Sequence, residues 1–75
     1  MTTLDVTIQD AIQQSIDLGR RTKIEVEEDS ESSIINALSF VDDYIDRREE
    51  DDGSWDVWGG EGEGEWRLRF VFIFV

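Results

Sequence analysis

The sequence predicts one small α+β domain over residues 1–75, with the element order αβαββ. Three observations lead to this fold class. Apolar residues recur at helical spacing in two segments, apolar and polar residues alternate in three shorter segments, and the length suits a single core. We expect two helices on one face of a three-stranded antiparallel or mixed sheet, with the strand order 1-3-2. A chain of this size buries only about 60% of its unfolded surface, so each large apolar side chain matters.

Residues 7–19, TIQDAIQQSIDLG, predict the first helix. Their apolar residues share one stripe: Ile8, Ala11, Ile12 and Ile16. Thr7 and Asp10 have the spacing of a capping box, and Gly19 suits the position after the last helical turn. The next segment, TKIEVEE over residues 22–28, alternates apolar with charged residues and predicts a strand with one wet face.

Residues 29–52, DSESSIINALSFVDDYIDRREEDD, predict the second helix. Its apolar residues follow at spacings of four, three and four: Ile34, Leu38, Val41 and Ile45. Asp29 and Ser30 are the expected capping residues. The helix should fade between residues 48 and 52, with Gly53 ending it.

SWDVW, residues 54–58, and EWRLRFVFIFV, residues 65–75, predict the second and third strands, joined by a flexible GGEGEGE connector. Trp55 and Val57 share one face of the second strand, and Asp56 and Trp58 share the other. From Phe70 onward the third strand is apolar on both faces, which is typical of a central, covered strand. We therefore place it between antiparallel neighbours. The helices should cover one of its faces: Trp66, Leu68, Phe70, Phe72 and Phe74.

The composition restricts the chemistry open to the chain. Without cysteine or histidine it has no disulfide, no thiolate and no imidazole base or metal ligand. Nineteen acidic residues against seven basic ones give a net charge of -12. Such a field disfavours direct binding of nucleic acid or an anionic membrane, and favours basic proteins. No leader or apolar run of about 18 residues is visible, so we expect a soluble cytoplasmic protein.

The acidic run DDYIDRREEDD, residues 42–52, is the most informative functional pattern. At the end of a helix its carboxylates would oppose the helix dipole, which suggests that they serve something outside the fold. DDGSWD lacks the ligand ladder of a calcium loop, and GGEGEG precedes a strand rather than opening a helix. Neither an enzyme, a metal site nor a cofactor is expected.

We therefore expect a non-enzymatic binding protein whose carboxylates imitate nucleic-acid phosphates and block a basic surface of a nucleic-acid-handling protein. Anti-CRISPR and anti-restriction proteins of phages or plasmids, and nuclease immunity proteins, are similar in size, acidity and chemistry. This is a resemblance of type, which no family motif carries. The candidate partner-binding residues are Asp42, Asp43, Asp46, Glu49, Glu50, Asp51, Asp52, Glu61 and Glu63, with Trp55 or Trp58 as an apolar anchor.

Two other interpretations stay open. Val71, Ile73 and Val75 lie on the strand face that no helix is expected to cover, so the chain is alternatively an assembly module that forms a homodimer there. In that case its acidity only keeps it in solution. The third interpretation is a domain adapted to high salt, which would lose stability at low salt.

Overall fold

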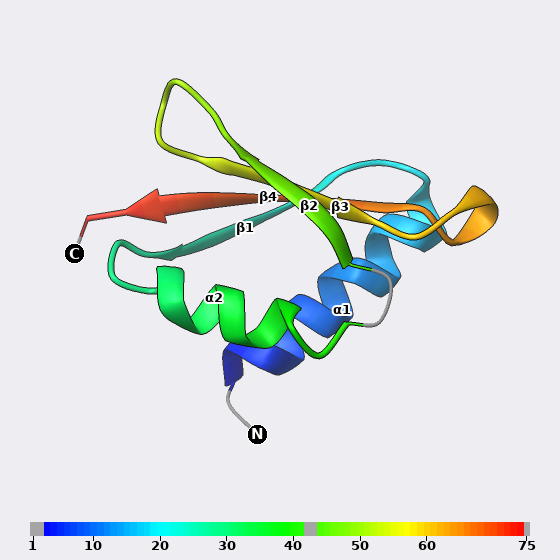
Figure 1. The fold of residues 1–75 in the computed structure, drawn as a ribbon, viewed down its shortest axis with the longest axis horizontal. Helices are drawn as coiled ribbons and strands as arrows, with labels where there is room; N and C mark the ends of the chain where they lie inside the picture. The colour runs from blue at the N-terminus through cyan, green and yellow to red at the C-terminus, as the bar shows by residue number, and fades with distance from the viewer. Residues whose placement is uncertain (1–2, 42–43, 75) are drawn as a thin grey trace.

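The computed structural model describes residues 3–41 and 44–74. It is an α+β fold in which two helices lie on one side of a four-stranded mixed sheet (Figure 1). In chain order the elements are α1 Thr3–Leu18, β1 Thr22–Glu27, α2 Glu31–Leu38, β2 Tyr44–Glu49, β3 Trp55–Gly59, the short 3-10 helix η1 Gly62–Gly64, and β4 Trp66–Ile73.

The sheet order is β1-β4-β3-β2, so β4 lies between β1 and β3. β4 pairs with β3 antiparallel but with β1 parallel. The central position predicted for the last strand is confirmed, but the predicted order 1-3-2 is not matched exactly, because the sheet has a fourth strand, β2, and β1 is parallel rather than antiparallel to β4. The extra strand explains the changed direction. β2 adds one chain reversal before β3, and this reversal turns β4 parallel to β1.

The prediction of one long helix over residues 29–52 is wrong. α2 ends at Leu38, and the chain continues as the edge strand β2. Strand pairing of β2 places Arg48 directly opposite Asp56, a favourable cross-strand pair, whereas a helix would have gathered carboxylates at its negative end. The apolar spacing was correct only in part. Ile34 and Leu38 are buried and Val41 packs against the core, while residue 45 belongs to β2.

The core lies between the helices and one face of the sheet. Its fully or nearly fully buried residues come from every layer: Ile8 and Ala11 of α1, Ile34, Ala37 and Leu38 of α2, Ile24 and Val26 of β1, Trp55 and Val57 of β3, and Trp66, Leu68 and Phe70 of β4. The predicted helix-facing side of β4 is confirmed up to Phe72, which is partly buried. Phe74 is a correction, because it lies beyond the end of β4 and is 83% exposed.

The first helix begins earlier than predicted. α1 starts at Thr3, so Thr7 lies inside the helix rather than at its cap. The predicted ending is confirmed. Gly19 has a φ of 65° and its N–H donates to the Ser15 carbonyl at 2.9 Å. A side chain at this left-handed position would be strained.

Ser15 is a buried polar residue that the apolar pattern did not reveal. Its hydroxyl donates to the Arg20 carbonyl at 2.8 Å and accepts from the Arg67 N–H at 2.9 Å. The side chain is 2% exposed, so neither backbone group has water as a ready substitute. One hydroxyl therefore joins the end of α1, the turn into β1 and the start of β4.

Replacing Ser15 with alanine should lower the free energy of unfolding by about 1–2 kcal/mol, because it leaves a buried N–H and a carbonyl unpaired. Ser32→Ala is the matched control, since Ser32 is an exposed serine of α2. Urea unfolding followed by tryptophan fluorescence measures both. Equal urea midpoints for the two variants would show that the hydrogen bonds of the Ser15 hydroxyl do not contribute measurably to stability.

Candidate functional site: the open face and the acidic end of the sheet

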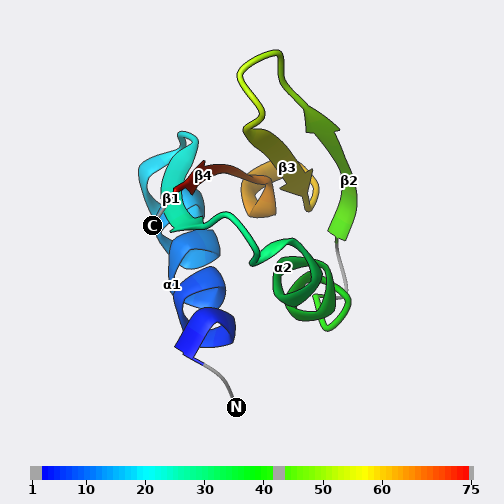
Figure 2. The same ribbon diagram turned by 90° about the vertical axis from the view of Figure 1, so that its left-hand side faces the viewer.

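The sheet has one face that, within residues 3–41 and 44–74, neither helix covers (Figure 2). Alternate residues of the four strands form rows across this open face. One row runs Lys23, Arg69, Asp56 and Arg48, in the order of the strands. The next row toward the start of β4 contains Arg67, Trp58 and Asp46. In the other direction the rows contain Glu25 with Val71, and Glu27 with Ile73.

Positive charge is concentrated on one half of the open face. Of the seven basic residues in the chain, five lie on this face or reach over it: Arg21, Lys23, Arg48, Arg67 and Arg69. Arg47 points to the opposite side, where its guanidinium stacks 4.7 Å from the centre of the Trp55 ring. A chain of net charge -12 thus carries most of its cations in one region.

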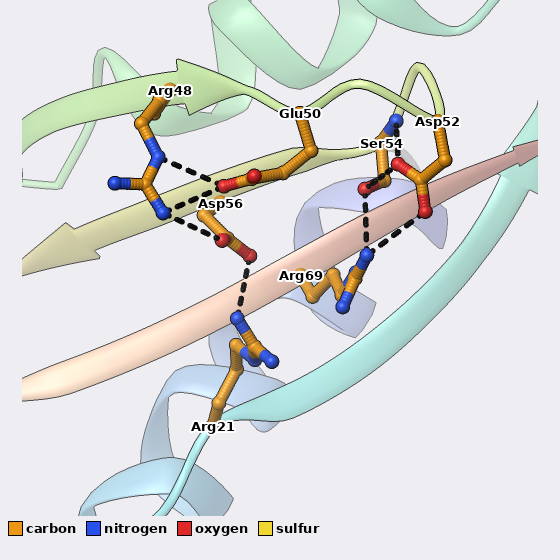
Figure 3. Close-up of polar contacts among 7 residues, drawn as sticks. All are labelled: Arg21, Arg48, Glu50, Asp52, Ser54, Asp56 and Arg69. Atoms are coloured by element: carbon orange, nitrogen blue, oxygen red, sulfur yellow. Dashed lines mark hydrogen bonds and ion pairs between the residues drawn. The ribbon is translucent and has the colours of Figure 1, made fainter.

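Asp56 anchors this basic region (Figure 3). Its carboxylate accepts a hydrogen bond from Arg21 Nη1 at 2.9 Å and lies 3.7 Å from Arg48 Nη2. Arg48 also donates to Glu50 Oε1 at 2.8 Å, a contact that raises the pKa of Arg48. The Asp56 side chain is only 12% exposed, so its carboxylate is largely desolvated. The two arginines compensate for the lost hydration of this charge.

A second polar cluster closes the β2–β3 turn. The hydroxyl and the backbone N–H of Ser54 donate to Asp52 Oδ1 at 2.6 and 3.0 Å. Arg69 Nη2 donates to Asp52 Oδ2 at 2.9 Å and to the Ser54 hydroxyl at 3.1 Å. The bonds from Ser54, followed by the Arg69 charge, lower the pKa of the Asp52 carboxyl below its ordinary value of 3.8.

This lowered pKa predicts a pH dependence. The Asp52 carboxylate stabilises the fold above its unfolded pKa, and this contribution is lost as the pH falls through the lower folded value. Asp52→Asn should therefore be less stable than the native chain at pH 7, and the difference should shrink below about pH 4. Urea unfolding across this range measures it. Asp51→Asn, an exposed neighbour, controls for the lost charge. A difference independent of pH would contradict the assignment.

The structure separates the predicted acidic residues into distinct groups. Asp42 and Asp43 lie outside the described residues. Asp46, Glu49 and Asp51 are exposed, and none of them forms an ion pair within the described part of the chain. Glu50 and Asp52 are paired with Arg48 and Arg69. None of the described ones stands at a helix end, so the argument from an opposed helix dipole does not hold.

The other two predicted acids lie far from the β2–β3 turn. Glu61 and Glu63 are exposed at η1, next to the start of β4, whereas the β2–β3 turn with Asp51 and Asp52 lies toward the end of β4. Trp55 is 5% exposed and packs edge-on against Phe72, with ring centres 5.1 Å apart. Trp58 is half-buried on the open face. Of these two tryptophans, only Trp58 presents a surface to a partner.

A second group of carboxylates joins those of the β2–β3 turn. The parallel pairing of β1 with β4 brings the β1–α2 turn to the end where β4 finishes, and the β2–β3 turn lies at that same end (Figure 1). We call this region the acidic end. Its seven exposed acidic residues are Glu27, Glu28, Asp29, Glu31, Glu49, Asp51 and Asp52. The sequence showed both groups, but only the strand pairing places them at the same end of the sheet, on either side of β4.

Apolar side chains lie within the acidic end. Ile73 is 41% exposed and Phe74 is 83% exposed, while the N–H of Glu28 donates to the Ile73 carbonyl at 3.0 Å. Val71, one of the three residues proposed for a homodimer, is half-buried, and Val75 lies outside the described residues. Exposed apolar groups rimmed by polar residues are a feature of binding surfaces.

None of the known protein families, curated proteins or solved structures compared with this chain matches it. Among the described residues, neither helix has the length and apolar character needed to cross a membrane. The function therefore has to be inferred from these two surfaces.

Proposed function

We propose that the protein is a non-enzymatic acidic binding protein that blocks a basic surface of a nucleic-acid-handling protein. The single observation that carries this proposal is the acidic end. Two turns distant in sequence lie at one end of the sheet, on either side of β4. Together with the adjoining ends of β1, α2 and β2 they expose seven carboxylates, of which only Asp52 is held in an internal ion pair within the described part of the chain.

The unpaired carboxylates favour an external role. The half-buried Glu50 is balanced by Arg48, as expected of an acid that serves the fold. At the acidic end, Glu28, Asp29 and Asp51 have no such partner among the described residues. The repulsion between adjacent carboxylates such as Glu28 and Asp29 is relieved when a cationic surface docks against them, and this relief favours binding.

The apolar side chains at the same end give the surface something besides charge. Ile73 and Phe74 can be buried by a partner, which adds a short-range contribution that salt does not screen. A nucleic-acid channel has both features that this surface requires, namely clustered lysine and arginine side chains and apolar or aromatic groups that contact bases. A protein seated there would exclude the nucleic acid.

The experiment is capture from a cell lysate on the immobilised protein at low salt and at about 1 M salt, where the Debye length is only about 3 Å. We expect the captured proteins to be basic nucleic-acid-binding proteins that high salt releases. Each captured protein is then purified and its binding measured singly. Partners that are acidic or uncharged, or binding that salt leaves unchanged, would contradict the proposal.

The open face favours a second candidate, the homodimer through Val71 and Ile73. Glu25 and Glu27 lie beside Val71 and Ile73, but cations occupy the other half of the same face, so a second copy can meet opposite charge there. Sedimentation over a range of concentrations tests it. A dimer that Ile73→Lys dissociates, and that Glu63→Lys at the other end of the sheet leaves intact, would support this candidate. A monomer at all concentrations would eliminate it.

A further inference from the structure

The basic half of the open face contains a hollow that the acidic end does not explain. It has a volume of about 240 Å³ and is lined by Arg21, Arg48, Asp56, Val57, Trp58, Arg67 and Leu68. Three of these seven residues are arginines and one is an acid. Three arginines therefore line one small space in a protein with a net charge of -12.

We propose that this hollow binds a small ligand that joins a flat ring to a phosphate or carboxylate group. The inference is independent of the acidic end and of any protein partner. Guanidinium groups are suited to such anions because their N–H groups form a planar fork that matches two anion oxygens.

The guanidinium groups beside the hollow are held in place by carboxylates, yet they keep N–H groups that can bind a ligand. Asp56 accepts from Arg21 Nη1 at 2.9 Å and lies 3.7 Å from Arg48 Nη2, while Glu50 Oε1 accepts from Arg48 Nε at 2.8 Å. Asp56 and Glu50 together therefore fix two guanidinium groups beside the hollow (Figure 3). Each guanidinium has five N–H groups, and these contacts leave Nε and Nη2 of Arg21 and Nη1 of Arg48 for a ligand. We assign Asp56 as the positioning residue of this site.

Arg67 is the most available of the three cations. Its only ion pair within the described residues is with Glu65, at 3.4 Å, and both side chains are more than half exposed. An exposed pair of this geometry contributes little, so an incoming anion can compete for the guanidinium. Arg67 also lies directly opposite Trp58 in the β3–β4 register.

Trp58 indicates that the ligand also contains a flat ring. Trp55 and Trp66 are buried at 5% and 1% exposure, while Trp58 is half-buried and lines the hollow. An indole face beside a cationic fork favours a planar ring that stacks while its anionic group meets the arginines. An isolated inorganic anion would contact only the guanidinium groups, and an uncharged ring would contact only the indole.

The test is calorimetric titration of the full chain with four probes: adenosine monophosphate, benzoate, adenosine and inorganic phosphate. We expect saturable binding of adenosine monophosphate, of benzoate, or of both, at least tenfold tighter than adenosine and inorganic phosphate. Binding of the first alone identifies phosphate as the anion, and binding of the second alone identifies carboxylate. The indole N–H signal of Trp58 in a nuclear magnetic resonance spectrum, assigned through Trp58→Phe, should shift on binding.

The chain supplies a closely matched control. Arg48→Gln and Arg47→Gln remove the same charge from adjacent residues whose side chains point to opposite faces of β2. Arg48→Gln should weaken binding about tenfold, whereas Arg47→Gln and Lys23→Gln should change it less than twofold, and circular dichroism checks the fold of each. No saturable binding by either anionic probe, equal affinity for adenosine, or equal loss in Arg47→Gln would overturn the proposal.

Discussion

Replacing Phe70 with alanine is expected to lower the free energy of unfolding by about 3–5 kcal/mol. Phe70 is fully buried in β4, the strand that pairs with both β1 and β3. Its register partners are Ile24 and Trp55, which are themselves core residues. A domain of this size has a total stability of about 4–11 kcal/mol, so the variant should be largely unfolded or close to it.

Phe74→Ala is the matched control for Phe70→Ala. It removes the same side chain from the same segment, but at a position that is 83% exposed. We expect a change within about 0.5 kcal/mol. Urea unfolding measures both variants. Similar losses would mean that residues 70 and 74 are equally covered, and the burial of β4 described above would then be wrong.

Neutralising the acidic end should produce the largest loss of partner binding. The variant carries Glu28→Gln, Asp29→Asn and Asp51→Asn, three exposed residues that form no ion pair within the described part of the chain. Charge complementarity raises association rates by about 10- to 1,000-fold. At low salt we expect the association rate constant with a captured partner to fall at least about tenfold. The dissociation rate should change less.

A control with equal net charge separates location from total charge. Asp10→Asn, Asp17→Asn and Glu63→Gln also remove three negative charges, from α1 and from η1. This variant should associate at nearly the native rate, and all three proteins should converge at about 1 M salt. Surface plasmon resonance at several salt concentrations gives the rates. An equal loss in the control would mean that only net charge matters, and the acidic end would not be a defined binding surface.

The sequence predicted well wherever local pattern and burial agree. The stripe of α1, the alternation in β1 and β3, and the buried face of β4 from Trp66 to Phe70 all follow from side-chain period. Gly19 also ends α1 as expected. In each of these segments the apolar residues follow either the helical period of 3.6 or the strand period of 2 clearly, and not both.

The prediction failed where two periods fit the same residues. Ile34, Leu38, Val41 and Ile45 have helical spacing, yet the segment divides between α2 and β2. What decides the outcome is long-range. β3 gains a paired neighbour, and Arg48 meets Asp56 across the strands. No local pattern contains this information.

The two candidate functional surfaces also depend on long-range strand pairing, which the sequence does not show. The acidic residues were visible as runs, but their placement at the same end of the sheet follows from the parallel pairing of β1 with β4. The hollow beside Trp58 was not predicted, because its arginines come from the α1–β1 turn, β2 and β4. The concentration of scarce basic residues was the available signal. The strand register places four of the seven on one face, and Arg21 reaches over it from the α1–β1 turn.

The most direct test of the proposed function is whether a captured partner can hold nucleic acid and this protein at the same time. Partner, labelled duplex and increasing amounts of the protein are mixed and resolved by sedimentation. If carboxylates occupy the sites of phosphates, the duplex leaves the partner as the protein binds, and the triple variant at Glu28, Asp29 and Asp51 displaces it poorly. A stable complex of all three components would show that the acidic end binds elsewhere, and nucleic-acid mimicry would be wrong.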